Sequence, residues 1–154
     1  MNYLIFDLDG TVINSEHRQL SLPDGRIDLV HWRENSTPEK IARDSLLPLA
    51  KFWRVMQSAH FHIIVCTARV MTTDDYTFLA RHGLCYNVCL SRKEGDSTPD
   101  NTLKILALKV YARKLGITWA HFCARATAYD DNARVLEAYA SHQITAHHPK
   151  DFAA

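Results

Sequence analysis

Apolar and polar positions along the chain alternate between strand-like runs and helix-like stripes. Short continuous apolar runs at 3–7, 61–66 and 86–90 predict buried strands, because strands covered on both faces lose the apolar/polar alternation. A fourth strand is expected at 121–129, where Arg125 and Thr127 interrupt the pattern, and a short fifth strand at 143–146. This pattern predicts a sheet of five strands.

Helical patterns separate these strands, with caps and glycines at their ends. The expected helices cover 37–47, 48–59, 72–82, 98–115 and 133–141. We expect the core-facing side chains to be Leu49, Phe52, Trp53 and Met56 in the second helix, Tyr76, Leu79 and Ala80 in the third, and Leu103, Leu106, Val110 and Ala107 in the fourth. The strand–helix alternation predicts a doubly wound α/β fold with a parallel sheet.

One long irregular segment follows the first strand. Residues 12–27 read as a loop or small hairpin, with a turn at Pro23-Asp24-Gly25, and Trp32 lies further on in a segment at 27–44. Long loops in compact domains are often functional. The whole segment is too short for a large cap domain, so we expect an open site.

Composition limits the possible classes of protein. The chain of 154 residues is expected to form one domain, 1–154, and its formal net charge of +1 gives no global attraction to nucleic acid or membrane. No apolar run approaches the roughly 20 residues of a membrane helix, and the amino terminus lacks a signal-peptide pattern. We therefore expect a cytoplasmic protein with Cys66, Cys85, Cys89 and Cys123 as reduced core thiols. Cys85 and Cys89 also have a spacing that zinc could use, although a strand through Cys89 explains it better.

Polar residues follow the predicted strands at their carboxyl ends. Asp7 and Asp9 follow the first strand, Thr67 the second, and Asp130 and Asp131 the fourth. The carboxyl ends of parallel strands meet at one edge of a sheet, and Lys104 near a helix start belongs to the same edge. If the first strand continues, Asp7 and Asp9 project the same way.

Clustered carboxylates need a divalent cation or a retained proton to relieve their repulsion. Such a set suits phosphoryl transfer: one Asp attacks phosphorus while the other moves a proton, and Lys104 offsets negative charge. A solvated acidic turn, a calcium loop, or a surface position for Lys104 are the alternatives.

With these motifs in this order, the chain resembles a phosphatase of the haloacid dehalogenase (HAD) superfamily. The run Asp7-Leu8-Asp9-Gly10-Thr11 matches the first motif of that superfamily, and Thr67, Lys104 and Asp130-Asp131 match the other three. The resemblance implies a Rossmann-like three-layer α/β/α fold with a minimal cap or none. It implies Asp7 as nucleophile and Asp9 as general acid and base. It also implies Mg²⁺ held by Asp7, the Asp9 backbone carbonyl, Asp130 and, directly or through water, Asp131.

The chain is also similar to the 3′-phosphatase domain of phage polynucleotide kinase-phosphatases. Arg18, Arg69 in Thr-Ala-Arg, the loop 92–96 and Asp100 carry this similarity, which implies substrate contacts for Arg18 and Arg69 and a supporting role for Asp100. The alternatives are solvated arginines, an Asp100 that only favours a helix start, and a Trp32 that packs in the core, which we favour over a base-stacking role. The chain has no Walker-type loop, so no kinase domain is expected, and the segment 27–44 is longer than in those relatives.

These observations favour a Mg²⁺-dependent phosphomonoesterase that removes a 3′-phosphate from a polynucleotide end. A small-nucleotide phosphatase is the alternative, and a non-catalytic phosphate-binding module or transfer to another acceptor are weaker hypotheses. The expected partner is a phosphorylated nucleotide or nucleic-acid 3′ end, in a bacterial host cytoplasm if the protein is phage-encoded. The sequence does not indicate an oligomeric state.

Overall fold

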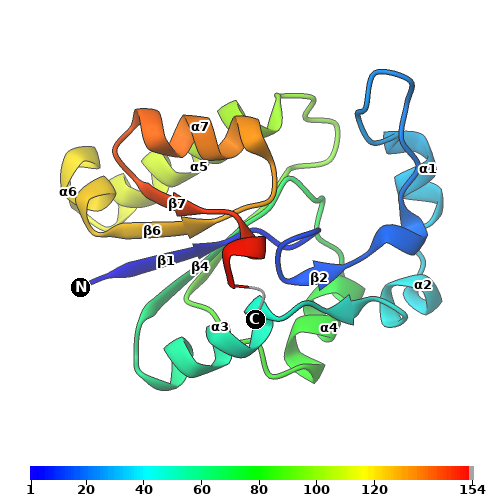
Figure 1. Cartoon of the computed structure of the whole chain (residues 1–154), viewed down its shortest axis with the longest axis horizontal. Helices are drawn as coiled ribbons and strands as arrows, with labels where there is room; N and C mark the ends of the chain where they lie inside the picture. The colour runs from blue at the N-terminus through cyan, green and yellow to red at the C-terminus, as the bar shows by residue number, and fades with distance from the viewer. Residues whose placement is uncertain (153–154) are drawn as a thin grey trace.

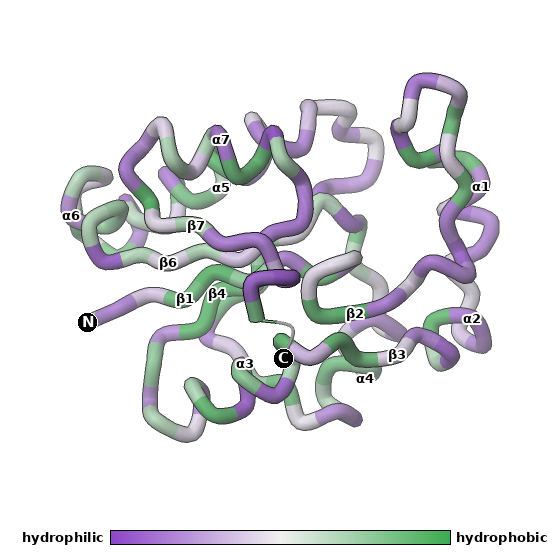
Figure 2. Tube along the Cα trace, viewed as in Figure 1, coloured by the Kyte–Doolittle hydropathy of each residue, from purple (hydrophilic) through white to green (hydrophobic). Residues whose placement is uncertain are grey.

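A five-stranded parallel sheet forms the centre of the computed structural model, which describes residues 1–152. The strand order is β5 (Val88–Leu90), β4 (His62–Cys66), β1 (Tyr3–Phe6), β6 (Ala126–Tyr129) and β7 (Thr145–His147). β1 is the middle strand, and its Phe6 is in register with Val65 on one side and Tyr129 on the other. Figure 2 shows hydrophobic residues concentrated in β1 and β4.

Helices cover both faces of the sheet (Figure 1). On one face lie α3 (Leu49–Ser58) and α4 (Thr73–Arg81), which pack on alternate strand residues such as Phe6 and Val65. On the other face lie α5 (Asp100–Lys114), α6 (Trp119–Ala124) and α7 (Ala133–Ser141), which pack on Ile5 and Ile64. This arrangement confirms the predicted doubly wound, three-layer α/β/α fold.

Residues 15–44, here called the insert, lie beyond the carboxyl ends of the strands (Figure 1). The insert contains a 3-10 turn, η1 (Glu16–Arg18), and two short helices, α1 (Leu29–Glu34) and α2 (Pro38–Ala42). It is flanked by β2 (Ile13–Asn14) and β3 (Ser45–Leu46), which pair antiparallel. A second 3-10 turn, η2 (Pro149–Phe152), follows β7.

Two predicted elements were wrong in extent. The expected strand at 121–129 is a short helix, α6, followed by the strand β6, because Thr118 caps the helix by accepting a hydrogen bond from the His121 amide at 3.1 Å. The expected helix at 37–47 ends at Ala42, because the following residues pair with β2 and the Leu47 amide donates to the Val12 carbonyl at 2.8 Å.

Two predicted helix faces were also wrong. In α5 the buried side chains are Lys104, Ile105, Leu108 and Ala112, whereas Leu106 and Val110 are about half exposed. In α4, Asp75 and Phe78 are buried with Leu79, whereas Tyr76 and Ala80 are exposed. The face of α3 is as predicted. Cys85 is exposed and so is not a core thiol.

Candidate active site

The strand pairing brings the first and fourth motifs together. Phe6 and Tyr129 are partners in the β1–β6 ladder, and the Asp7 amide donates to the Tyr129 carbonyl at 3.1 Å. Asp7 and Asp130 therefore leave neighbouring strands at the same level. Carboxylate oxygens of Asp7, Asp130 and Asp131 lie within 4.8 Å of one another. We call these three residues the acidic cluster.

Lys104 joins the acidic cluster from the buried face of α5. Its Nζ donates to Asp7 Oδ1 at 2.9 Å and to Asp130 Oδ2 at 2.6 Å. Burial alone would lower the pKa of Lys104, but the charges of Asp7 and Asp130 outweigh burial and raise it. Lys104 therefore stays charged and fixes the relative position of two motifs that lie far apart in the sequence.

Gly10 and Thr11 complete the surroundings of Asp7. The Thr11 hydroxyl donates to Asp7 Oδ2 at 2.9 Å, so both carboxylate oxygens of Asp7 have a partner. Gly10 has φ +77°, and a Cβ added there would lie 2.2 Å from Asp131 Oδ2. The first motif therefore requires glycine both for its backbone conformation and for the close approach of Asp131.

The acidic cluster has more negative charge than Lys104 can balance. Burial, and next the negative charge of Asp7, raise the pKa values of Asp130 and Asp131 above that of an ordinary carboxyl group. Asp130 is buried, whereas Asp131 is exposed and opens the cluster to solvent. Three convergent carboxylates with surplus negative charge are oxygen donors of the kind that Mg²⁺ prefers, so these residues fit the predicted metal.

The Asp9 side chain lies apart from the acidic cluster. β1 ends at Phe6, so strand alternation does not extend to Asp9, contrary to the expectation that Asp7 and Asp9 project the same way. Asp9 accepts hydrogen bonds from Ser15 Oγ at 2.6 Å and from Arg69 Nε at 3.1 Å. Burial would raise the pKa of Asp9, but the charge and hydrogen bonds of Arg69, with the Ser15 hydrogen bond and the Arg18 charge, together outweigh burial and lower it. Asp9 is therefore held ionised, facing the insert.

Arg18 and Arg69 lie close to Asp9, but both are bound to protein carboxylates. Arg69 pairs with Asp9 and with Asp75 at 2.6 Å, and its NH2 lies 3.7 Å from Asp44 Oδ2. Arg18 is fully buried and binds both oxygens of Asp44, at 3.0 and 2.7 Å. We call Asp9, Asp44, Asp75, Arg18 and Arg69 the clamp. It ties the insert to the loops after β1 and β4, and the substrate contacts expected of Arg18 and Arg69 stay predictions.

The remaining predicted residues organise neighbouring loops. Thr67 is buried at the end of β4, and its Oγ1 accepts a hydrogen bond from the Arg69 amide at 3.0 Å. Asp100 pairs with Arg92 at 2.8 Å, and Arg92 also donates to the carbonyls of Ala68, Asp96 and Thr98. Arg92 thus fastens the loop before α5 to the loop after β4.

Sequence reasoning missed Asp44 and Asp75. The sequence did contain a signal for Asp75, because its spacing from Thr72 is that of a capping box. The two residues form this box at the start of α4, with the Thr72 amide donating to Asp75 at 2.8 Å. The sequence contained no signal for Asp44, which follows α2 and belongs to no motif. Its contacts with Arg18 and Arg69 form only when the chain folds. Trp32 was expected in the core, but its ring packs on the guanidinium groups of Arg18 and Arg69.

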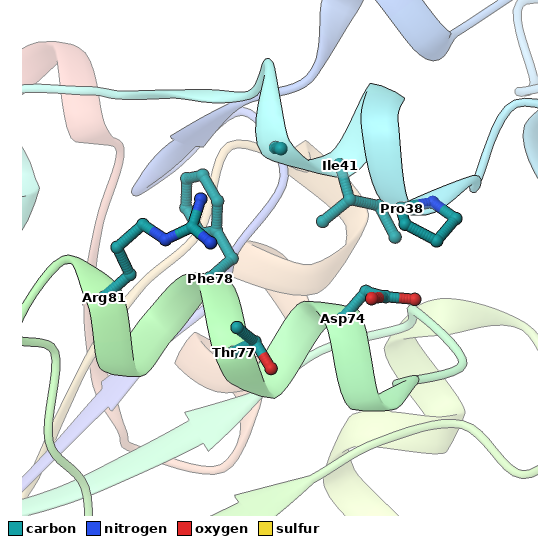
Figure 3. Close-up of a pocket in the computed structure, with 7 residues that line it drawn as sticks. Pro38, Ile41, Asp74, Thr77, Phe78 and Arg81 are labelled. Carbon is teal, nitrogen blue, oxygen red and sulfur yellow. The ribbon is translucent and has the colours of Figure 1, made fainter.

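A cavity of about 50 Å³ lies between α2 and α4 (Figure 3). Ile41 and Phe78 line it from the two helices, and Asp74 and Arg81 are its charged residues. The acidic cluster contributes nothing to its lining. This cavity therefore belongs to the packing of the insert on α4 and not to the candidate active site.

Solved structures resemble the whole fold. A haloacid dehalogenase-like hydrolase from Streptococcus pneumoniae matches with a TM-score of 0.67 and 11% identity, over 95% of this chain and 83% of that one. A HAD-superfamily hydrolase from Geobacter sulfurreducens matches with a TM-score of 0.64 and 12% identity, over 95% and 85%. A chain of the Pnkp1/Rnl/Hen1 RNA repair complex matches with a TM-score of 0.61 and 20% identity, over 96% of this chain and 42% of that one. These likenesses show the HAD fold.

Sequence comparison is more specific. The 5′-deoxynucleotidase of Escherichia phage T5 is 40% identical over 98 residues, which cover 61% of this chain and 37% of that protein. The match thus spans well under half of the relative's length. The family model described as bacteriophage T5 5′-deoxynucleotidase matches residues 1–150, nearly the whole chain. This chain therefore belongs to the bacteriophage T5 5′-deoxynucleotidase family.

Proposed function

We propose that this protein is a Mg²⁺-dependent phosphomonoesterase that removes the 5′-phosphate from deoxynucleoside monophosphates. The observation that carries the proposal is the contact of Lys104 with both Asp7 and Asp130 beside Asp131, at the carboxyl edge of a HAD-type sheet. Family membership supports the substrate class, since the phage T5 relative is a 5′-deoxynucleotidase.

Each step of hydrolysis has a candidate residue. An Asp7 oxygen attacks phosphorus, the bond from phosphorus to the 5′ oxygen breaks, and Asp9 gives a proton to that oxygen. Asp9 then takes a proton from the water that hydrolyses the aspartyl-phosphate. Lys104 holds Asp7 in place, and Thr67 with nearby backbone amides binds phosphate oxygens. Asp7, the Asp9 carbonyl, Asp130 and Asp131 would hold Mg²⁺, which would supply positive charge to the phosphate oxygens.

The ion pair with Arg69 has a consequence for Asp9. Because Arg69 lowers the pKa of Asp9, this carboxylate must gain a proton before it can act as an acid. An arriving phosphate brings negative charge near both groups, which weakens the hold of Arg69 and favours that proton. The resting ion pair is thus compatible with the proposed role.

The sequence favoured a polynucleotide 3′-phosphatase, whereas the comparisons support the small-nucleotide alternative. The residues that carried the first hypothesis are engaged elsewhere in this structure: Arg18 and Arg69 bind clamp carboxylates and Asp100 binds Arg92. The net charge of +1 also gives little attraction to a polyanion. We therefore place the mononucleotide first.

A phosphate-release panel with and without Mg²⁺ tests the proposal. The panel holds deoxynucleoside 5′- and 3′-monophosphates, ribonucleoside 5′-monophosphates and a 3′-phosphorylated oligonucleotide. We expect Mg²⁺-dependent release, fastest from the deoxynucleoside 5′-monophosphates. Faster release from the oligonucleotide would favour the 3′-phosphatase, and nucleotide binding without any release would favour a binding module. Trapping with alcohol acceptors would reveal transfer to another acceptor.

A further inference from the structure

Trp32 in α1 lies beside the candidate active site and outside the apolar core. Its ring centroid is 4.2 Å from Cζ of Arg18 and 5.4 Å from Cζ of Arg69. The residue is half-buried, so part of the indole remains accessible. A tryptophan that rests on charged groups at the mouth of a site needs an explanation other than core packing.

Trp32 is held both at its backbone and, through Arg18, at its ring. The Trp32 carbonyl accepts a hydrogen bond from Ser36 Oγ at 2.7 Å, and Ser36 Oγ accepts one from Arg18 NH1 at 3.0 Å. Arg18 is itself held by Asp44. The ring is therefore pre-organised, and little conformational entropy is lost when a ligand packs on it.

The indole is also linked to Asp9 through a shared neighbour. Arg69 contacts both Asp9 and the Trp32 ring. If Asp9 protonates the leaving oxygen, the sugar and base of the nucleotide lie near the groups around Asp9, which include Arg69 and the Trp32 ring. The NH2 atoms of Arg18 and Arg69 both approach Asp44 Oδ2, at 2.7 and 3.7 Å, so the guanidinium groups are neighbours on the indole.

We propose that Trp32 is a specificity-determining residue that stacks on the base of the nucleotide. This inference rests on the proposed function and deepens it. Aromatic side chains stack on bases of any sequence because every base has a π face. The two guanidinium groups support the indole, and the base packs on its accessible surface. The insert then selects nucleotides over simpler phosphate esters.

The test compares a deoxynucleoside 5′-monophosphate with 2-deoxyribose 5-phosphate, which keeps the reacting group and lacks the base. For Trp32→Leu we expect the ratio of kcat/KM for these two substrates to fall about tenfold or more, mainly through KM for the nucleotide. Trp32→Phe, which keeps a π face, should restore most of the ratio. Trp119→Phe is the matched control, since Trp119 on α6 packs on Phe122 at the opposite end of the sheet (Figure 1). An equal loss on both substrates in Trp32→Leu would overturn the inference.

A binding measurement separates this inference from the proposed function. In the Asp7→Asn background, we expect deoxyadenosine 5′-monophosphate to quench tryptophan fluorescence and 2-deoxyribose 5-phosphate to have little effect. Trp32→Phe should abolish this quenching, whereas Trp119→Phe should keep it. Quenching that survives Trp32→Phe would overturn the stacking role. A wild-type protein that hydrolyses neither substrate would sink the proposed function, and the quenching would still test Trp32.

Discussion

At Gly10 a single missing methyl group decides how close Asp131 can come to the first motif. Gly10 and Gly83 have similar positive φ values, +77° and +67°, but only at Gly10 would a Cβ meet another group. The two glycines therefore allow the cost of backbone conformation to be separated from the cost of crowding the acidic cluster.

We expect Gly10→Ala and Gly83→Ala each to lower the free energy of unfolding by about 1 kcal/mol, because alanine disfavours positive φ. Only Gly10→Ala should also displace the Asp131 carboxylate, and it should raise the Mg²⁺ concentration needed for half-maximal activity. Urea unfolding and Mg²⁺ titrations of phosphate release measure the two effects. Equal Mg²⁺ dependence in both variants would contradict the assigned role of Gly10.

Asp7→Asn should abolish turnover while leaving the fold intact. The amide keeps nearly the same shape: its single oxygen can accept from Lys104, and its NH2 group can donate to the Thr11 hydroxyl, which can turn to accept. An amide is nevertheless a very poor nucleophile. We expect a loss of about a thousandfold or more in kcat, with phosphate binding partly retained. Asp24→Asn, on the exposed tip of the insert, is the matched control and should behave as wild type. Substantial turnover by Asp7→Asn would rule out an aspartyl-phosphate at this position.

At the scale of elements, charged residues on buried faces explain most of the errors in the sequence prediction. α5 buries Lys104, and α4 buries Asp75, so a search for apolar stripes places the inward faces of both helices wrongly. Helix α3 buries no charge, and its face was predicted correctly. A buried lysine was recognisable only because it matched a motif, whereas Asp44 and Asp75 matched no motif that identifies their partners.

The clamp is an element-scale feature whose buried charges should affect stability. Asp44→Asn would leave Arg18 fully buried without its counter-charge, so we expect a loss of about 3 kcal/mol in the free energy of unfolding. The insert should also become more sensitive to limited proteolysis. Urea unfolding and protease digestion provide the measurements, and Asp24→Asn, which breaks an exposed ion pair, should change neither. An unchanged midpoint of urea unfolding for Asp44→Asn would show that the clamp does not stabilise the fold.

At the scale of the whole molecule, the parallel arrangement could be read from the sequence because strand and helix patterns alternate along most of the chain. The helix α6 could not be predicted from the sequence. Its six residues run into the apolar residues of β6, and the start of the helix depends on one cap at Thr118. The position of the insert over the carboxyl edge follows from long-range pairs such as Arg69 with Asp44, which no local pattern contains. Within residues 1–152, no helix has the length and apolar character to cross a bilayer.

We expect the acidic cluster to make global stability depend on pH and Mg²⁺ together. The pKa values of Asp130 and Asp131 rise to about 7 from the ordinary 3.8, so between these values the folded protein holds protons that the unfolded chain releases. The contribution of these two carboxyl groups to the free energy of unfolding therefore falls as pH rises between the two values. We expect Mg²⁺ to raise Tm more at about pH 8 than at about pH 6, because a divalent cation replaces those protons. Thermal unfolding at both pH values, with and without Mg²⁺, measures this difference. Asp131→Asn removes one carboxylate and should weaken the rise in Tm. An equal Mg²⁺ shift at both values would contradict it.

The central place of β1 has a consequence for how the protein is made. During synthesis β1 and Asp7 precede the strand partner β6 and the other carboxylates of the acidic cluster by about 120 residues. Until then a nascent chain can pair β1 with β4 alone, and one flank of the middle strand stays open. The acidic cluster is thus assembled only after β6 has been made and has paired with β1.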